Sequence, residues 1–135
     1  MSDMNKQIIE EFRANDGKVG GYFANSTLLL LHTTGAKSGK ERINPLVTIE
    51  DGDRLVIVAS KGGAPSNPDW YYNVVANPVV DVEYGTERFQ PRATVTAEPE
   101  RTELYGKIAG DFAAFAEYEK QTSRVIPVVT LSRLS

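Results

Sequence analysis

The chain has 135 residues, of which 41% are hydrophobic and 24% are charged, and its formal net charge is -3. These values predict one globular domain over residues 1–135. The acidic balance argues against a general nucleic-acid binder, because binding of phosphate backbones requires a basic surface. The absence of cysteine excludes thiol catalysis, and a single histidine without an acidic cluster argues against a metal centre.

The N-terminal segment MSDMNKQIIEEFRANDG is polar and lacks the basic flank and the long apolar stretch of a signal peptide. No stretch of the sequence has the length of a membrane span. We therefore expect a cytoplasmic protein.

The first half of the chain predicts one helix and three strands. Ile8, Ile9 and Phe12 share one face of the helix, and Gly17 follows as a stop signal. The second strand contains Pro45, which cannot donate to a ladder and therefore belongs at a sheet edge or a bulge. The predicted ranges are a helix over 3–14 and strands over 27–34, 42–50 and 54–60, with a turn at 51–53.

The second half predicts two helices and three strands. Asn67, Pro68 and Asp69 form a helix start, with a capping side chain, a proline at the first helical position and an acid in the first turn. The longest helix carries apolar residues near one stripe, and the last strand contains an interior proline. The predicted ranges are a short helix over 69–77, strands over 79–84 and 88–98, a long helix over 99–121 and a strand over 124–134.

Most of these strands are joined by tight turns, and only two crossings use helices. This order favours an α+β fold. We expect a mostly antiparallel sheet of about six strands that curls into a small barrel, with a short N-terminal helix, a short middle helix and one long helix packed outside.

The stretch HTTGAKSGKERINPL, residues 32–46, concentrates glycine, hydroxyl and basic residues after an apolar strand. A nucleotide phosphate loop requires four residues between its glycines, then Gly-Lys-Ser/Thr, then a helix. Here three residues separate Gly35 from Gly39, Glu41 stands at the hydroxyl position, and a strand follows. A nucleotide phosphate loop is therefore excluded.

A hairpin with an anion-binding tip is the interpretation that is left. Glycines allow backbone N–H groups to turn toward a ligand, Lys37 and Arg42 supply charge, and Ser38 supplies a hydroxyl. The competing interpretation is that hairpin tips are often rich in lysine, glycine and serine for solubility alone.

A second informative stretch is VASKGGAPSNPDWYYN, residues 58–73. A strand ends in Ser60 and Lys61, two glycines follow, and an aromatic cluster opens the next helix. A basic loop beside aromatic rings suits a flat anionic ligand, whereas a solvated lysine and plain core packing of the rings are the competing interpretations. Two such loops after neighbouring strands favour a ligand site more than either loop alone.

The segments TTGAKSGKERINPL, VASKGGAPSNPDWYYNVVANPVVDVEYG and AEYEKQTSRVIPVVTL together resemble the deazaflavin-dependent nitroreductase family. The similarity runs from about Leu28 to Leu131. It implies a single split β-barrel domain that binds coenzyme F-420, a deazaflavin with a phosphate and an oligoglutamate tail.

The resemblance also implies a role for each loop. The first hairpin would hold the phosphate and tail, the strand after it would lie along the deazaflavin ring, and the next strand would flank the ring. The start of the middle helix would contact the tail, with its tryptophan as a packing wall. The implied cofactor-binding residues are Ala36, Lys37, Ser38, Arg42, Ile43, Asn44, Pro45, Leu46, Val47, Val58, Ala59, Ser60, Lys61, Asp69, Trp70, Tyr71, Tyr72, Asn73 and Phe115.

The implied activity is transfer of a hydride from reduced deazaflavin to a small apolar acceptor, such as a quinone, an enone or a nitroaromatic. Phe112, Phe115 and Tyr118 would line the acceptor pocket, where family members often carry three tyrosines. The loss of two hydroxyls favours flat, apolar acceptors. Tyr118 and Ser60 are the candidate catalytic residues, and His32 is expected to be packed in the fold.

Two other functions remain open. One is an FMN oxidoreductase on the same type of barrel, because the phosphate of FMN also suits Lys37 and Arg42. The other is a non-catalytic carrier of F-420. An edge strand would permit a homodimer, and membrane association is expected only through a lipophilic quinone. No nucleic acid and no metal is expected as a partner.

Overall fold

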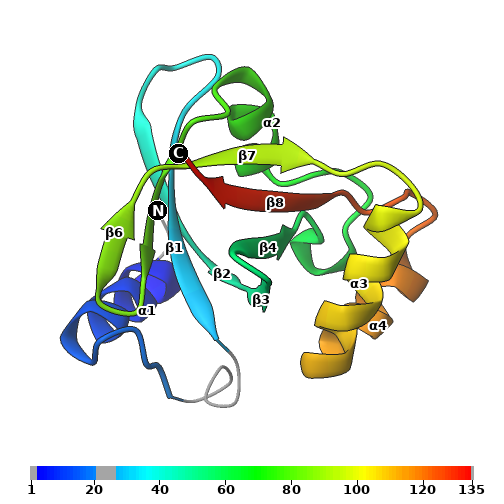
Figure 1. Cartoon of the computed structure of the whole chain (residues 1–135), viewed down its shortest axis with the longest axis horizontal. Coiled ribbons are helices and arrows are strands. Elements are labelled where there is room, and N and C mark those ends of the chain that lie inside the picture. The colour runs from blue at the N-terminus through cyan, green and yellow to red at the C-terminus, as the bar shows by residue number, and fades with distance from the viewer. Residues whose placement is uncertain (1–2, 21–26, 135) are drawn as a thin grey trace.

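The computed structural model describes residues 3–20 and 27–134 and has an α+β architecture with two four-stranded antiparallel sheets (Figure 1). The first sheet has the strand order β2-β1-β5-β6, and the second has the order β3-β4-β8-β7. The strands are β1 Leu28–Thr34, β2 Glu41–Val47, β3 Ile49–Asp51, β4 Arg54–Val58, β5 Asp81–Tyr84, β6 Glu87–Phe89, β7 Pro91–Val95 and β8 Val128–Arg133. The helices are α1 Asp3–Ala14, the 3-10 turn η2 Lys61–Gly63, α2 Asp69–Ala76, α3 Glu100–Asp111 and α4 Ala114–Gln121.

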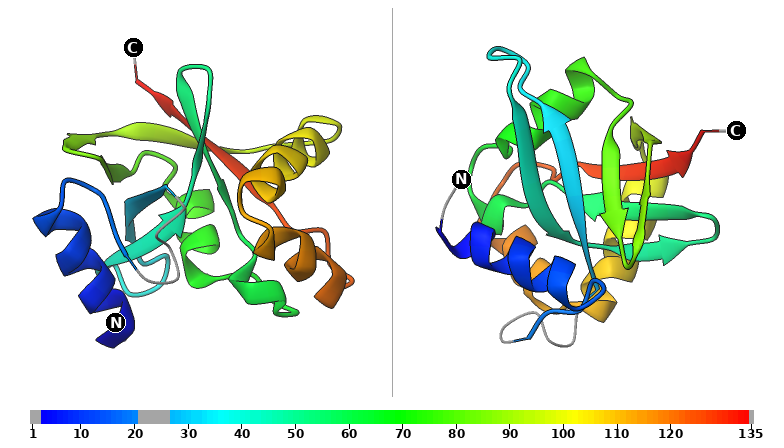
Figure 2. Two further views of the ribbon diagram at one scale, coloured as in Figure 1. Left: turned by 90° about the horizontal axis from the view of Figure 1, so that it is seen from below. Right: turned by 90° about the vertical axis from the view of Figure 1, so that its left-hand side faces the viewer.

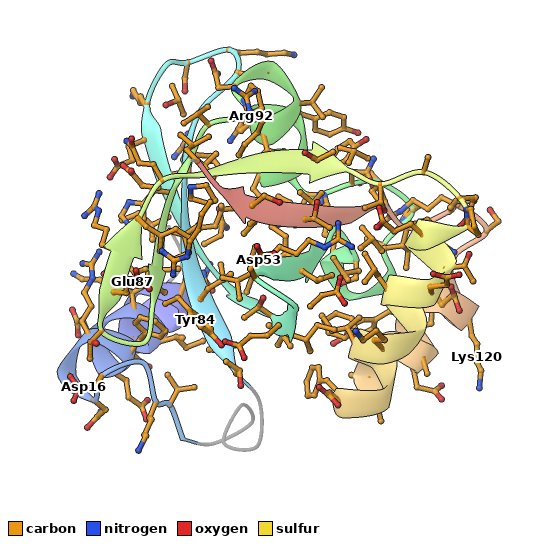
Figure 3. All side chains as sticks on the ribbon, viewed as in Figure 1. Asp16, Asp53, Tyr84, Glu87, Arg92 and Lys120 are labelled. Atoms are coloured by element: carbon orange, nitrogen blue, oxygen red, sulfur yellow. The ribbon has the colours of Figure 1, made fainter. Side chains whose placement is uncertain are left out.

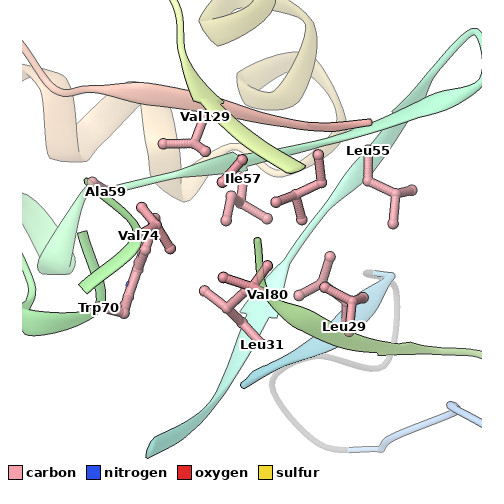
Figure 4. Close-up of a cluster of buried hydrophobic side chains, with 12 residues drawn as sticks. Leu29, Leu31, Leu55, Ile57, Ala59, Trp70, Val74, Val80 and Val129 are labelled. Carbon is pink, nitrogen blue, oxygen red and sulfur yellow. The ribbon is translucent and has the colours of Figure 1, made fainter. Parts of the chain in front are cut away.

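The largest apolar cluster lies between the two sheets (Figure 4). Leu29 and Leu31 of β1 belong to it on the side of the first sheet. Ile57 of β4 and Val129 of β8 belong to it on the side of the second sheet, and Trp70 of α2 joins the same cluster. Burial of this layer holds the sheets face to face.

Smaller clusters cover the outer faces of both sheets. Ile9 and Phe12 of α1 pack against Leu28 and Leu30 of β1. The helices α3 and α4 pack against the outer residues of β4 and β8. The strand β1 is thus buried on both faces, which explains why its apolar residues run continuously instead of alternating with polar ones.

Two of the predicted strands are bent and shared between the sheets. The range 42–50 divides at Thr48 into β2 and β3, and the range 88–98 divides in the same way into β6 and β7. The Thr48 N–H donates to the Thr27 carbonyl at 2.9 Å, and its hydroxyl donates to the Val56 carbonyl at 2.8 Å. These bonds fix the corner where the chain leaves one sheet for the other. The prediction of about six strands was therefore wrong, and the described residues form eight.

The predicted long helix over 99–121 was also wrong, because the chain breaks at Phe112 into α3 and α4. Phe112 has extended backbone angles, with φ -137° and ψ 98°, and the glycines of α3 weaken the helix before the break. The hydroxyl of Tyr105 donates to the Phe115 carbonyl and holds α4 against α3. The described residues therefore form four α-helices where three were expected.

The start of α2 differs from the prediction in its cap. The helix begins at Asp69, which is the predicted acid of the first turn, and Pro68 occupies the N-cap. The Asn67 side chain does not cap the helix, because its Oδ1 accepts a hydrogen bond of 2.7 Å from Arg124 Nη1.

Two other prolines and the first helix lie partly where they were predicted. The last strand begins after Pro127, so this proline is not interior to the strand as predicted. Pro45 lies in β2, an edge strand of the first sheet, as predicted. The helix over 3–14 is confirmed, and Gly17 follows it with φ +93°.

A charged network fastens α1 to the first sheet. Arg13 donates to both carboxylate oxygens of Glu83, at 3.1 and 2.7 Å, and His32 Nε2 lies 2.6 Å from Glu83 Oε2. His32 is buried, as expected. The hydrogen bonds from Arg13, with a smaller contribution from His32, lower the pKa of Glu83 to about 2.

The helices occupy separate parts of the molecule. In Figure 1 and in the left view of Figure 2, α1 lies at one end of the molecule, and α3 and α4 lie at the other. Charged side chains such as Asp16, Glu87 and Lys120 are exposed on the outside (Figure 3). Within residues 3–20 and 27–134, no helix combines the length and the apolar character needed to cross a membrane.

Candidate functional site

Three hollows follow one another along the edge strand β2, with volumes of about 570, 380 and 200 Å³. Neighbouring hollows share lining residues, so the three form one continuous surface, which we call the β2 groove. The first and second hollows share Arg42, Asp69 and Asn73, and the second and third share Lys61, Pro68 and Trp70.

The first hollow lies at the tip of the β1–β2 hairpin. The Gly35 N–H donates to the Lys40 carbonyl at 2.8 Å, and the Gly39 N–H donates to the Gly35 carbonyl at 2.9 Å. Gly39 has φ +71°, a conformation that favours glycine. This closed turn leaves the side chain of Lys37 exposed. The lining residues are Gly35, Ala36, Lys37, Ser38, Arg42, Asp69, Tyr72 and Asn73.

Asn73 ties this hairpin to α2. Its Oδ1 accepts a hydrogen bond from the Ala36 N–H at 2.9 Å, and its Nδ2 donates to the Thr33 hydroxyl at 3.1 Å. Because Asn73 is buried, these bonds form away from water and gain strength from the low local dielectric. The orientation of the hairpin tip is therefore set by α2.

The second hollow brings together β2, α2 and α1. Asn5 of α1 lines it, although no pattern in the sequence indicated that the first helix belongs to the site. Pro68 was likewise missed, because it was interpreted only as part of a helix start. The lining residues are Asn5, Glu41, Arg42, Ile43, Asn44, Lys61, Pro68, Asp69, Trp70 and Asn73.

Three exposed cations, Lys37, Arg42 and Lys61, lie along the groove. None of the ion pairs between described residues involves any of them. Glu41 and Asp69 also line the groove, so its charge is mixed. The three unpaired cations are available to an anionic ligand, and the guanidinium fork of Arg42 suits a phosphate.

The third hollow is the most apolar part of the groove. Phe115 makes edge contacts with Phe112 and Tyr118, with ring centroids 5.4 and 5.6 Å apart. The break between α3 and α4 brings Phe112 to the same hollow as the other two rings. Ser60 is one of the few polar residues at this end. The lining residues are Pro45, Leu46, Val47, Val58, Ser60, Lys61, Pro68, Trp70, Phe112, Phe115 and Tyr118.

Tyr105 supports the three rings of the third hollow, Phe112, Phe115 and Tyr118, which we call the aromatic wall. Its hydroxyl donates to the carbonyl of Phe115, and burial raises the pKa of Tyr105 to about 12. Because the Tyr105 hydroxyl is hydrogen-bonded and hard to ionise, Tyr105 fixes the position of the aromatic wall and does not supply a proton to the groove.

Two predicted cofactor-binding residues lie outside the lining of the groove. Ala59 is fully buried in the core between the sheets, and Tyr71 packs against the same cluster. The expectation that the two basic loops follow neighbouring strands was also wrong. The loops follow β1 and β4, which belong to different sheets. The loops nevertheless border one groove, since Lys61 and Arg42 line the same hollow.

A family model described as F-420H(2)-dependent quinone reductase matches residues 4–133. The chain belongs to the F-420H(2)-dependent quinone reductase family. The F-420H(2)-dependent quinone reductase Rv1261c of Mycobacterium tuberculosis is 40% identical over 126 residues, which cover 90% of this chain and 85% of the relative.

Two solved structures resemble this quinone reductase family member over most of its length. One, titled as an F-420-H2 dependent reductase (FDR-A), is 40% identical, with a TM-score of 0.72, and the match covers 78% of this chain and 93% of that chain. Another, whose title describes a domain-swapped dimer, is 36% identical, with a TM-score of 0.74 over 96% of this chain and 95% of that chain.

Membership of the family confirms the prediction of an F-420-dependent reductase with coenzyme F-420 as cofactor. The name of the family is that of quinone reductases, in agreement with the expected flat, apolar acceptor. The predicted family name was nitroreductase, whereas the family model that matches is described as a quinone reductase.

Proposed function

We propose that this member of the quinone reductase family binds reduced coenzyme F-420 along the β2 groove and reduces a flat, apolar quinone. The observation that carries the proposal is the continuity of the groove, which runs from unpaired cations at the hairpin to an apolar hollow walled by aromatic rings. A cofactor with an anionic tail and a flat ring requires both kinds of surface in one site.

The donors along the groove fit the anionic part of the cofactor. Lys37 and Arg42 would hold the phosphate and the tail carboxylates by charge-assisted hydrogen bonds, with Ser38 as a hydroxyl donor beside them. Lys61 would add charge in the second hollow. The Ala36 N–H already donates to Asn73, so in this proposal Ala36 contributes to the shape of the tip and not a donor.

The edge strand fits the flat part of the cofactor. Pro45, Leu46 and Val47 of β2 line the third hollow together with Val58 and Trp70. Because β2 pairs with β1 on one side only, the backbone groups on its other side are available to polar atoms at the edge of a heterocycle. Trp70 is buried and would serve as the wall between tail and ring.

The acceptor would lie against Phe112, Phe115 and Tyr118. When bound, reduced F-420 supplies a hydride, and the protein provides binding, orientation and exclusion of water. Ser60 and Tyr118 are the hydroxyl-bearing side chains of this hollow and would orient an acceptor oxygen or pass it a proton. The apolar rings at 112 and 115 favour quinones over acceptors that need several hydrogen bonds.

We extend the proposal to fold and assembly. The two sheets, joined by the bends at Thr48 and after Phe89, would correspond to a split barrel. A homodimer is supported by the edge strands and by the relative whose title describes a domain-swapped dimer. Light scattering of the purified protein tests the dimer, and a monomeric mass at all concentrations would contradict it.

Turnover of reduced F-420 tests the main proposal. We expect that catalytic amounts of the protein accelerate the oxidation of reduced F-420 by a panel of quinones, followed by the absorbance of oxidised F-420 under anaerobic conditions. The Lys37→Ala variant should turn over more slowly at low cofactor concentration. Lys40→Ala, which removes a neighbouring exposed lysine outside the groove lining, is the matched control. Absence of acceleration with every quinone would contradict the proposal.

A further inference from the structure

The guanidinium of Arg124 donates four hydrogen bonds beside the groove, although Arg124 lines none of the three hollows. Its Nε donates to the Ala64 carbonyl at 2.8 Å, and its Nη1 donates to the Asn67 side chain at 2.7 Å. Its Nη2 donates to the carbonyls of Ser60 and Ala59, at 2.8 and 3.2 Å. One guanidinium therefore joins both ends of the segment 59–67.

Among the described residues, Lys61 of this segment is the basic side chain that lines both the second and the third hollow. Lys61 has φ +48°, in the left-handed region that non-glycine residues rarely adopt. Such a conformation persists only where the surroundings determine it, and it often occurs at functional sites. We attribute this conformation of Lys61 to the hydrogen bonds from Arg124, which hold the segment around it.

The other side of the segment is held by α4. Gly63 has φ +82°, and a Cβ atom at this position would lie 2.9 Å from Gln121 Oε1 and 3.1 Å from the Tyr118 carbonyl. The segment thus fits between α4 and the Arg124 guanidinium. A shift of either support would move Lys61 and Ser60 relative to the aromatic wall.

We propose that Arg124 is a positioning residue for the cofactor site and acts through Lys61. This inference rests on the proposed function, because it assigns Lys61 to the bound F-420. The fork of an arginine can reach several carbonyls at once, whereas a lysine has one ammonium and cannot reproduce this geometry. Arg124→Lys therefore keeps the charge and removes the positioning.

Arg101 offers a matched control. It is also largely buried, with 12% of its side chain exposed, and its Nη1 donates to the Ile126 carbonyl at 2.9 Å. It therefore anchors the same linker between α4 and β8 without contacting the segment 59–67 or lining the groove. The Arg101 guanidinium also lies 5.6 Å from the centroid of the Tyr105 ring. Because Arg101→Lys keeps a cation there, it should perturb the fold to a similar extent without moving the segment 59–67.

The test is a titration of F-420 into the wild type, Arg124→Lys, Arg101→Lys, Lys61→Ala and the double variant Arg124→Lys/Lys61→Ala. We expect Arg124→Lys to raise the Kd roughly tenfold and Arg101→Lys to change it less than about twofold. If Arg124 acts through Lys61, its replacement should have little further effect in the Lys61→Ala background.

An unchanged Kd in Arg124→Lys, or an equal loss in both backgrounds, would overturn the inference. If Arg124→Lys does not fold, Asn67→Ala removes one acceptor of the fork and should weaken binding a few-fold, and wild-type affinity in that variant would overturn the inference instead. Failure of the wild type to bind F-420 would contradict the proposed function. In that case, amide hydrogen exchange of the segment 59–67 still tests the positioning, because Arg124→Lys should accelerate it and Arg101→Lys should not.

Discussion

The charges at α1 and the charges of the β2 groove differ in how they are paired. Beside α1, the guanidinium of Arg13 and the ring of His32 in β1 both contact one carboxylate, Glu83, which is largely shielded from water. Along the groove, Arg42 and the two lysines have no carboxylate partner among the described residues.

This difference separates stability from binding. Removing one partner of a charge pair that is shielded from water destabilises the fold, because it leaves the other partner with an uncompensated desolvation cost. Charges that are unpaired and exposed contribute little to the fold and retain their interaction with a ligand. Variants in the two regions should therefore fail in different assays.

The largest effect is expected from Glu83→Ala. It leaves the buried His32 and the guanidinium of Arg13 without their shared carboxylate, and we expect a loss of about 3 kcal/mol in the free energy of unfolding. Glu87→Ala is the control in the neighbouring strand, because Glu87 pairs with Arg133 at the surface. Urea denaturation measures both, and equal losses would contradict the comparison.

Acidification should remove the same stabilisation. The folded protein holds the pKa of Glu83 at about 2, below its ordinary value of 4.5. The unfolded chain therefore takes up the proton first, so this stabilisation is present above pH 4.5 and is lost as the pH falls toward 2. Its size is on the order of 3 kcal/mol. Unfolding free energies of Glu83→Gln should vary less steeply with pH in this window than those of the wild type, and identical slopes would refute the assignment.

In the groove, Arg42→Ala should weaken F-420 binding and leave the fold unchanged. Loss of a charge-assisted contact costs about 1.5–3 kcal/mol of binding free energy, and added salt should weaken the wild type more than the variant. Arg92→Ala removes another exposed arginine, from β7, and should change neither property. Calorimetric titration and thermal unfolding measure the two outcomes. If Arg42→Ala destabilises the protein, Arg42 contributes to the stability of the fold, and its assignment to ligand binding alone is wrong.

The smallest effect is expected at the apolar end. Phe112→Tyr restores a hydroxyl to the third hollow, where it can donate to an acceptor oxygen. We expect the ratio of kcat/KM between a nitroaromatic and an apolar quinone to rise by a factor that corresponds to about 1 kcal/mol. The KM for F-420 should not change. An unchanged ratio would remove Phe112 from the acceptor pocket.

Local signals in the sequence predicted much of the fold. The stripe of Ile8, Ile9 and Phe12, the glycine after it and the apolar run of β1 each indicate an element from neighbouring residues alone. The bend at Thr48 could not be predicted in this way, because it depends on bonds to Thr27 and to β4.

The break at Phe112 has the same origin. The apolar stripe of a helix continues through residues 99–121, and the break is stabilised by packing of α4 on η2 and by the bond from Tyr105. The packing on η2 joins residues that are distant in sequence, and the bond from Tyr105 forms only once the helix is broken. Periodicity alone therefore favours one uninterrupted helix.

The residues of the site also divide into those that local sequence predicted and those that depend on contacts in space. The cations at 37, 42 and 61 were predicted because charge in a glycine-containing loop is visible in the sequence. Asn5 and Arg124 were not placed in the site, because their roles depend on which loop they reach in space. The resemblance to a known family supplied the identity of the cofactor, which residue patterns left open between F-420 and FMN.

The most direct test of the central claim is a competitive titration of the wild-type protein with F-420 and FMN. We predict tighter binding of F-420, because its oligoglutamate tail can use the cations of the first and second hollows that a shorter FMN phosphate would leave unpaired. Equal or tighter binding of FMN would contradict the assignment of the β2 groove to F-420.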